Sequence, residues 1–279
     1  MNKLELQKMA NEVRKGILTG VHAAKAGHPG GSLSAAEVFT YLYFEEMNID
    51  PKNPEDPDRD RFVLSKGHTA PGLYATLANR GYFPVEDLLT LRQIGSHLQG
   101  HPCKQHTPGI DMSSGSLGQG ISAACGMALA GKLRNKDYRV YTLLGDGEIE
   151  EGQVWEAAMF AAAKKLDNLV VIVDNNGLQI DGPIEEVNSP YPIDKKFESF
   201  NFHVINVEDG NDFDQLAAAF HEARETKGVP TAIIMKTVKG KVVSFMENQV
   251  SWHGSAPNDE QYEAAMEELK KVEEALCQK

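Results

Sequence analysis

The sequence predicts an α/β fold in which a mainly parallel sheet is flanked by helices on both faces, and three observations support this. Residues 140–144 and 169–173 are apolar runs typical of buried strands, and between them residues 148–166 have apolar side chains at helical spacing. Strands and helices alternate in the same way along much of the chain. Polar clusters at 145–147 and 174–177 follow the two strands, at the edge where open α/β sheets bind ligands.

The other elements follow from periodicity. Apolar residues at helical spacing predict helices at 4–25, 33–47, 71–80, 85–92, 121–133, 213–226 and 258–276. Short apolar runs predict strands at 62–65, 202–207 and 231–235. Glycine, proline and polar residues predict irregular segments at 26–31, 50–61, 95–120 and 188–200, while 236–252 is polar and matches no pattern. Segment 95–120 is long for a connection inside a compact domain, which favours a functional role.

Composition narrows the class of protein. With 279 residues, 41% hydrophobic and 24% charged, the chain is ordinary for a globular protein, and its alternating elements predict one domain over 1–279. The net charge of −12 argues against nucleic acid or an anionic membrane as partner. Its 3 cysteines have neither disulfide parity nor metal-ligand spacing, no apolar run reaches the ~18 residues of a membrane helix, and the start is no signal peptide. We therefore expect a cytoplasmic protein.

The two polar clusters predict a metal site. Gly145 and Gly147 let the backbone approach an anion, but Asp146 between them would repel a phosphate directly. A divalent cation such as Mg²⁺ removes the conflict, because it binds carboxylate, amide, carbonyl and phosphate oxygens. Asp146, the side-chain oxygen of Asn176 and a backbone carbonyl just after it could supply ligands, and we expect the Asp146 carboxylate to be exposed. The Gly-Asp-Gly turn or the Asn-Asn-Gly turn alone would usually be structural. The two turns together, after successive strands of one βαβ unit, are a rarer combination.

Four histidines lie in loops beside glycine or proline: His28, His68, His101 and His253. A single loop histidine is usually only hydrogen-bonded or solvated. Four such loops that could meet at one sheet edge favour a site, because imidazoles donate hydrogen bonds to diphosphate and sugar oxygens and move protons near neutral pH.

The stretch GDGEIEEGQVWEA, followed by a helix and NNGLQIDG, resembles the thiamine diphosphate (ThDP) and metal-binding motif of transketolases. The loops GHPG, KGH, GHP with SLGQG, and HGSAP occur in the same order in that family, so the resemblance spans nearly the whole chain. It implies the ThDP-binding fold, ThDP as cofactor and Mg²⁺ as metal, with Ca²⁺ or Mn²⁺ as substitutes. Asn175 stands where many transketolases have an acidic residue, a departure without expected consequence.

The resemblance also implies a role for each matching residue. The implied metal ligands are Asp146, Asn176 and the main-chain carbonyl of Leu178. The implied cofactor contacts are His68 and His253 at the diphosphate, the Gly147 backbone N–H, Asn176, the flanking residues Gly115, Ser116 and Leu117, Ile180 near the thiazolium ring, and Glu151, which matches an acid at the family's dimer interface. The implied catalytic residues are His28, His101 and His253, the first two facing the donor sugar.

The family also has pyrimidine-binding and C-terminal domains, and its catalytic glutamate lies in the former. We therefore expect the N-terminal subunit of a split transketolase, which transfers a ketol unit between sugar phosphates of the pentose phosphate pathway. A second chain would carry the glutamate, and the resemblance implies a heterotetramer of two plus two chains. The alternatives are the α subunit of a 2-oxo acid dehydrogenase and a non-catalytic ThDP-binding module.

Overall fold

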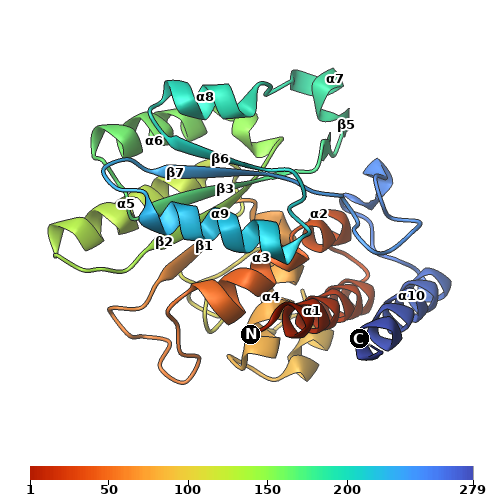
Figure 1. The fold of residues 1–279 in the computed structure, drawn as a ribbon. Coiled ribbons are helices and arrows are strands. Elements are labelled where there is room, and N and C mark those ends of the chain that lie inside the picture. Colours follow the sequence, from red (N-terminus) through yellow and green to blue (C-terminus); the bar gives the residue numbers. More distant parts are fainter. Residues whose placement is uncertain (279) are drawn as a thin grey trace.

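In the computed structural model, which describes residues 1–278, the central feature is a five-stranded sheet with the order β1-β2-β3-β7-β6 (Figure 1). All of its strand pairs are parallel. The strands are β1 (Arg61–Leu64), β2 (Val140–Gly145), β3 (Leu169–Asn175), β6 (His203–Val207) and β7 (Thr231–Lys236). A small antiparallel pair, β4 (Leu178–Gln179) and β5 (Gly182–Pro183), follows β3. The predicted α/β fold with a parallel sheet is confirmed.

Helices cover both faces of this sheet (Figure 1). The α-helices are α1 (Lys3–Ala24), α2 (Pro29–Ser34), α3 (Ala36–Tyr41), α4 (Ala70–Arg80), α5 (Gln119–Leu133), α6 (Gly152–Ala163), α7 (Ile184–Asn188), α8 (Ile193–Ser199), α9 (Phe213–Glu225) and α10 (Asp259–Cys277). Short helical turns of other types lie at η1 (Leu42–Glu46), η2 (Gly67–Thr69), η3 (Val85–Thr90), η4 (Glu148–Glu150) and η5 (Val250–Trp252). Helix α1 begins at a capping box, in which the Asn2 side chain accepts from the Glu5 N–H.

Alternate residues of the strands pack into two apolar cores, one on each face of the sheet. On one face Tyr141, Ile172 and Ile233 pack with helices α1, α3, α4 and α9. On the other, Val140 and Val171 pack with α5, α6 and α8. Strand β3 is buried from Leu169 to Asp174, as expected for a central strand covered on both faces. The sheet is therefore a rigid support for the loops at its carboxyl edge.

Several predictions of local structure are wrong. A helix begins inside the glycine-rich loop predicted at 26–31, because Pro29 occupies the first helical turn, where its missing N–H is tolerated. The helix predicted at 33–47 is consequently broken into α2, α3 and η1. Segment 188–200, predicted to be irregular, contains α8, whose Phe197 is buried against Trp155 with ring centroids 5.1 Å apart.

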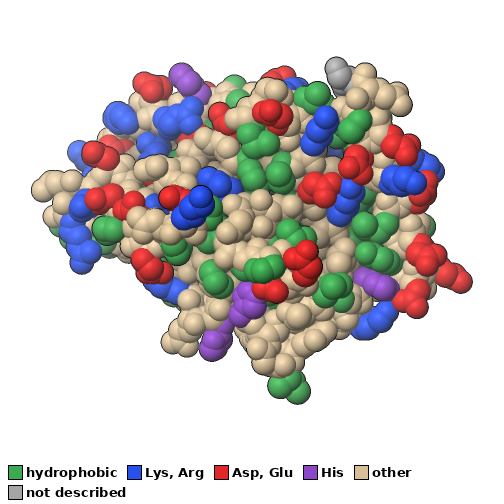
Figure 2. Space-filling model, turned by 90° about the horizontal axis from the view of Figure 1, so that it is seen from below, with side chains coloured by type: hydrophobic (Ala, Val, Ile, Leu, Met, Phe, Trp, Pro, Cys, Tyr) green, Lys and Arg blue, Asp and Glu red, His purple; other side chains and the backbone are tan. Residues whose placement is uncertain are grey.

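The surface carries acidic and basic side chains side by side, and the face seen from below shows them interspersed (Figure 2). Across the described residues 1–278, no helix has the length and apolar character needed to cross a membrane.

Candidate functional site

A cavity of about 290 Å³ opens at the carboxyl edge of the sheet, where β2 and β3 end. Ten of the residues singled out from the sequence line it: His28, His68, Gly115, Leu117, Asp146, Gly147, Asn176, Leu178, Ile180 and His253. They come from segments as distant in the chain as the residue before α2 and the turn after η5. The structure therefore brings together most of the candidate site residues.

Asp146 is the centre of the turn after β2, and its carboxylate bridges the two polar clusters. One carboxylate oxygen accepts a hydrogen bond from the Gly147 N–H at 2.9 Å, and the other accepts from the Gly177 N–H at 2.6 Å. The residue is only 3% exposed, so the expectation of an exposed carboxylate was wrong. Burial, together with the nearby carboxylate of Asp174, raises the pKa of Asp146 to about 7. Such a site favours a cation beside the carboxylate.

Gly147 lies close to the side chain of Gln179. A Cβ atom on this residue would lie 2.6 Å from the side-chain oxygen of Gln179, which packs over the turn. The turn can therefore approach β4 closely, and its backbone faces the cavity.

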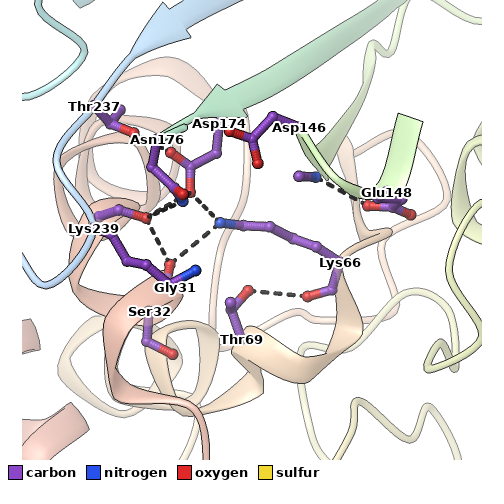
Figure 3. A network of polar contacts seen from close by, with 12 residues as sticks. Gly31, Ser32, Lys66, Thr69, Asp146, Glu148, Asp174, Asn176, Thr237 and Lys239 are labelled. Atoms are coloured by element: carbon purple, nitrogen blue, oxygen red, sulfur yellow. Dashed lines mark hydrogen bonds and ion pairs between the residues drawn. The ribbon is translucent and has the colours of Figure 1, made fainter. Parts of the chain in front are cut away.

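Asn176 is oriented by a buried polar network, which Figure 3 shows from close by. Its side-chain N–H group donates to Asp174 at 3.2 Å, while its oxygen accepts from the Leu178 N–H at 3.2 Å. Asp174, fully buried, also accepts from Ser34 at 2.5 Å and forms an ion pair with Lys66. The Lys66 ammonium keeps the pKa of Asp174 below its usual value against the opposing effect of burial.

The main-chain carbonyl of Leu178 accepts a hydrogen bond from a cationic group. The Lys239 ammonium donates to this carbonyl at 2.9 Å and lies 3.0 Å from His253 Nδ1. Lys239 is 2% exposed, and burial lowers its pKa to about 8. The cavity therefore contains two buried lysines, Lys66 and Lys239, although the chain as a whole carries a net charge of −12.

Three of the four candidate histidines form a cluster in the cavity. The ring centroids of His28 and His68 are 5.2 Å apart, those of His28 and His253 are 5.5 Å apart, and His68 stacks on His253 at 5.2 Å. Burial lowers the pKa of His28 to about 4 and that of His253 to about 3, and it lowers the pKa of His68 as well. All three imidazoles are therefore neutral at pH 7 and can donate or accept hydrogen bonds.

These pKa values predict a pH dependence of folding. The unfolded chain protonates its histidines near pH 6.5, whereas the folded chain keeps His253 neutral until about pH 3. Between these values the unfolded state binds more protons, so this residue lowers the free energy of unfolding as the pH falls. We expect His253→Asn to lose less stability than the wild type between pH 6.5 and pH 4. Denaturant titrations of both proteins at several pH values measure the difference, and parallel pH profiles would contradict the assignment.

Three predicted site residues are outside the lining of the cavity. Ser116 and Glu151 are exposed beside it, where a further molecule could reach them. His101 lies next to Gly115, since a Cβ on that glycine would be 3.4 Å from the His101 ring. Burial and the charge of Arg92 lower the pKa of His101.

Sequence reasoning missed four residues with polar side chains in the lining: Lys66, Glu148, Gln179 and Lys239. Lys66 had a usable signal, because it follows a predicted strand directly before Gly67 and His68. Lys239 lies in segment 236–252, which matches no pattern, so nothing in the sequence pointed to it.

The residues fit a divalent cation with a diphosphate. Asp146, the Asn176 side-chain oxygen and the Leu178 carbonyl form an all-oxygen set, which suits Mg²⁺ or Ca²⁺ rather than softer metals. Within residues 1–278, no group of three or more His, Cys, Asp or Glu side chains is arranged to hold a metal. A cation here would therefore need phosphate or water oxygens to complete its coordination, and the two lysines would offset the remaining anionic charge.

The sequence matches the model of one family over residues 6–272, described as "Transketolase, thiamine diphosphate binding domain". Among similar proteins, the 6-deoxy-6-sulfo-D-fructose transketolase subunit SqwG of Clostridium sp. (strain MSTE9) is 46% identical over 269 residues, which cover 96% of this chain and 98% of that protein. An apulose-4-phosphate transketolase subunit of Phocaeicola vulgatus is 43% identical, and the match covers 98% of this chain and 96% of that protein.

The fold is similar to that of solved transketolases. The crystal structure of transketolase from Campylobacter jejuni superposes with a TM-score of 0.90 at 31% sequence identity. The alignment covers 99% of this chain but 46% of the Campylobacter chain, so this protein spans less than half of that transketolase.

Proposed function

The chain belongs to the transketolase family through its thiamine diphosphate binding domain, and we propose that it is the cofactor-binding subunit of a split transketolase. It transfers a two-carbon ketol unit from a ketose to an aldose in complex with a second chain. Residues 1–279 form one diphosphate-binding domain, and the second chain carries the pyrimidine-binding domain with its glutamate. Two relatives of matching length are named as transketolase subunits, which supports this division.

The observation that carries the proposal is the cavity in which an all-oxygen ligand set, two buried lysines and three clustered histidines meet. Asp146, Asn176 and the Leu178 carbonyl hold Mg²⁺, and Lys239 lies beside them to contact the diphosphate. When bound, ThDP supplies the carbon that accepts the ketol unit. His68 and His253 orient the diphosphate, and the neutral His28 holds or donates a proton at the sugar, together with His101.

Further contacts complete the proposed site. Gly115, Ser116 and Leu117 flank the cofactor, and Ile180, which is 62% exposed at the cavity mouth, packs against the thiazolium ring. Glu151 is exposed at the start of α6, where it contacts the partner. Two such pairs of chains assemble as a heterotetramer that works in the cytoplasm.

The substrate class is an anionic ketose and an aldose phosphate. The sequence suggested the pentose phosphate pathway, but the two relatives are named for 6-deoxy-6-sulfo-D-fructose and apulose-4-phosphate. Both names describe transketolases, which supports ketol transfer as the reaction. Their sugars differ, so the names do not assign a pathway. The family match argues against the 2-oxo acid dehydrogenase alternative. Ketol transfer by the assembled chains would exclude a non-catalytic ThDP-binding module.

Titration calorimetry with ThDP, with and without Mg²⁺, tests this function. We expect Mg²⁺-dependent binding that His68→Ala weakens about tenfold or more, because a hydrogen bond to a charged group contributes about 1.5–3 kcal/mol. His101→Ala reduces turnover of the assembled enzyme more than ThDP affinity, since His101 lies outside the cavity lining. His203→Ala is the control, because that histidine is partly exposed on β6 and pairs with Glu222 on α9. Equal effects of the first two substitutions on ThDP affinity would refute the division of roles.

A further inference from the structure

Glu148 is a buried carboxylate next to the proposed metal-binding turn, and it holds three separate segments together. One of its oxygens accepts hydrogen bonds from the Ser65 hydroxyl and from the Gly118 N–H at 2.9 Å. Its other oxygen accepts from the Gly145 N–H at 3.0 Å. The residue is 2% exposed, and all three donors are uncharged groups. A carboxylate is suited to this place because both of its oxygens accept.

The segment joined at Gly118 forms a wall of the cavity. Gly115 and Leu117 line the cavity, and this segment is fastened on both sides of them. On one side the Ser114 hydroxyl donates to the Leu64 carbonyl at 2.6 Å. On the other side the Gly118 N–H donates to the Glu148 carboxylate, and Gly118 itself has a left-handed backbone with φ of 79°. The position of the wall therefore depends on this carboxylate.

We propose that Glu148 is a positioning residue that fixes the 113–120 loop to the Gly145–Gly147 turn. It thereby fixes the position of the 113–120 loop, which would contact the rings of the cofactor, relative to the Gly145–Gly147 turn, which would contact its diphosphate. The expected effect on ThDP binding rests on the proposed function, whereas the docking of the loop by Glu148 does not. Glu148 acts through the loop and touches none of the reacting atoms.

Glu148→Gln tests the proposal, because an amide has one accepting oxygen and must leave one of the two backbone N–H groups without a partner. Asp60→Asn is a matched control at the other edge of the sheet. Asp60 is 7% exposed and likewise accepts from two backbone N–H groups, those of Asn48 at 2.8 Å and Arg139 at 2.7 Å. Both amide variants should lose similar thermal stability. Glu148→Met removes both acceptors at similar side-chain length.

Two measurements on the full-length chain separate positioning from simple stabilisation. Hydrogen exchange in the ligand-free chain should accelerate on the order of tenfold for residues 113–120 in Glu148→Met, and to a smaller degree in Glu148→Gln. It should stay unchanged there in Asp60→Asn. Titrations should show ThDP binding weakened on the order of tenfold, whereas inorganic diphosphate with Mg²⁺, which lacks the rings, is affected less.

The proposal is overturned if loop 113–120 exchanges at the wild-type rate in Glu148→Met, or if Asp60→Asn accelerates it equally. It is also overturned if both probes lose affinity by the same factor. If the wild-type chain binds neither probe, the proposed function loses its support, and the exchange rates still decide whether Glu148 docks the loop.

Discussion

The isolated chain should show no ketol transfer above background, and activity should appear when a second chain with a pyrimidine-binding domain is added. The reason is geometric, because enzymes of this family hold ThDP between two domains, and this chain aligns with 46% of a solved transketolase chain. A neighbouring reading frame of similar size that encodes such a domain would be the candidate partner to test. A ketol-transfer assay on the separate and mixed chains measures the effect, and sedimentation reports whether a two-plus-two assembly forms.

The control for this experiment is the mixture in which the cofactor-binding chain carries the Asp146→Asn substitution. It should assemble but remain inactive, which separates assembly from catalysis. Full activity of the isolated chain would show that the glutamate is supplied from within it and that the split-subunit interpretation is wrong. A complex that binds ThDP without any transfer would instead favour the non-catalytic module.

Asp146→Asn should abolish Mg²⁺-dependent ThDP binding while the chain stays folded. The substitution removes the only carboxylate among the three proposed ligands, yet it keeps the size of the side chain and an acceptor for one of the N–H groups of Gly147 and Gly177. Even substitutions of residues that only support metal ligands weaken binding by roughly 10- to 100-fold, so we expect a loss of more than about a hundredfold. Titration calorimetry with ThDP and Mg²⁺ measures it.

Asp181→Asn is the matched control, because this carboxylate lies in the β4–β5 turn near the same site but is exposed. Its ThDP affinity should equal that of the wild type. Unchanged affinity in Asp146→Asn would contradict the metal assignment, provided that circular dichroism shows both variants folded.

The sequence pattern predicted the sheet and most of the cavity because both depend on features that are local in the chain. Buried parallel strands appear as apolar runs, and the polar residues that end them must meet at one edge. Long-range packing explains what was missed. The residues next to Asp146 in the chain do not indicate that its carboxylate is buried against the Gly177 N–H. Likewise, the residues next to Lys239 do not indicate that it donates to the Leu178 carbonyl, 61 positions away.

Other misses have the same origin. Residues 193 to 199 were predicted to be irregular because of the nearby prolines, but burial of Phe197 against Trp155 stabilises a helix there. Glu148 was only the first residue of the helix predicted over 148–166. Its role as an acceptor for Gly118 depends on a contact 30 positions away in the chain, which no motif records.

The strand order has a consequence for how the protein acquires its activity. Strand β1 pairs with β2 across more than seventy residues, and β3 pairs with β7 across about sixty, so the sheet closes only when distant segments have met. The cavity draws on residues from His28 to His253. A chain still emerging from the ribosome, or one whose last third has not yet docked, therefore has no place to retain the cofactor. We expect the chain to bind the cofactor only late in folding. Cofactor binding would then distinguish fully folded chains from incompletely folded ones.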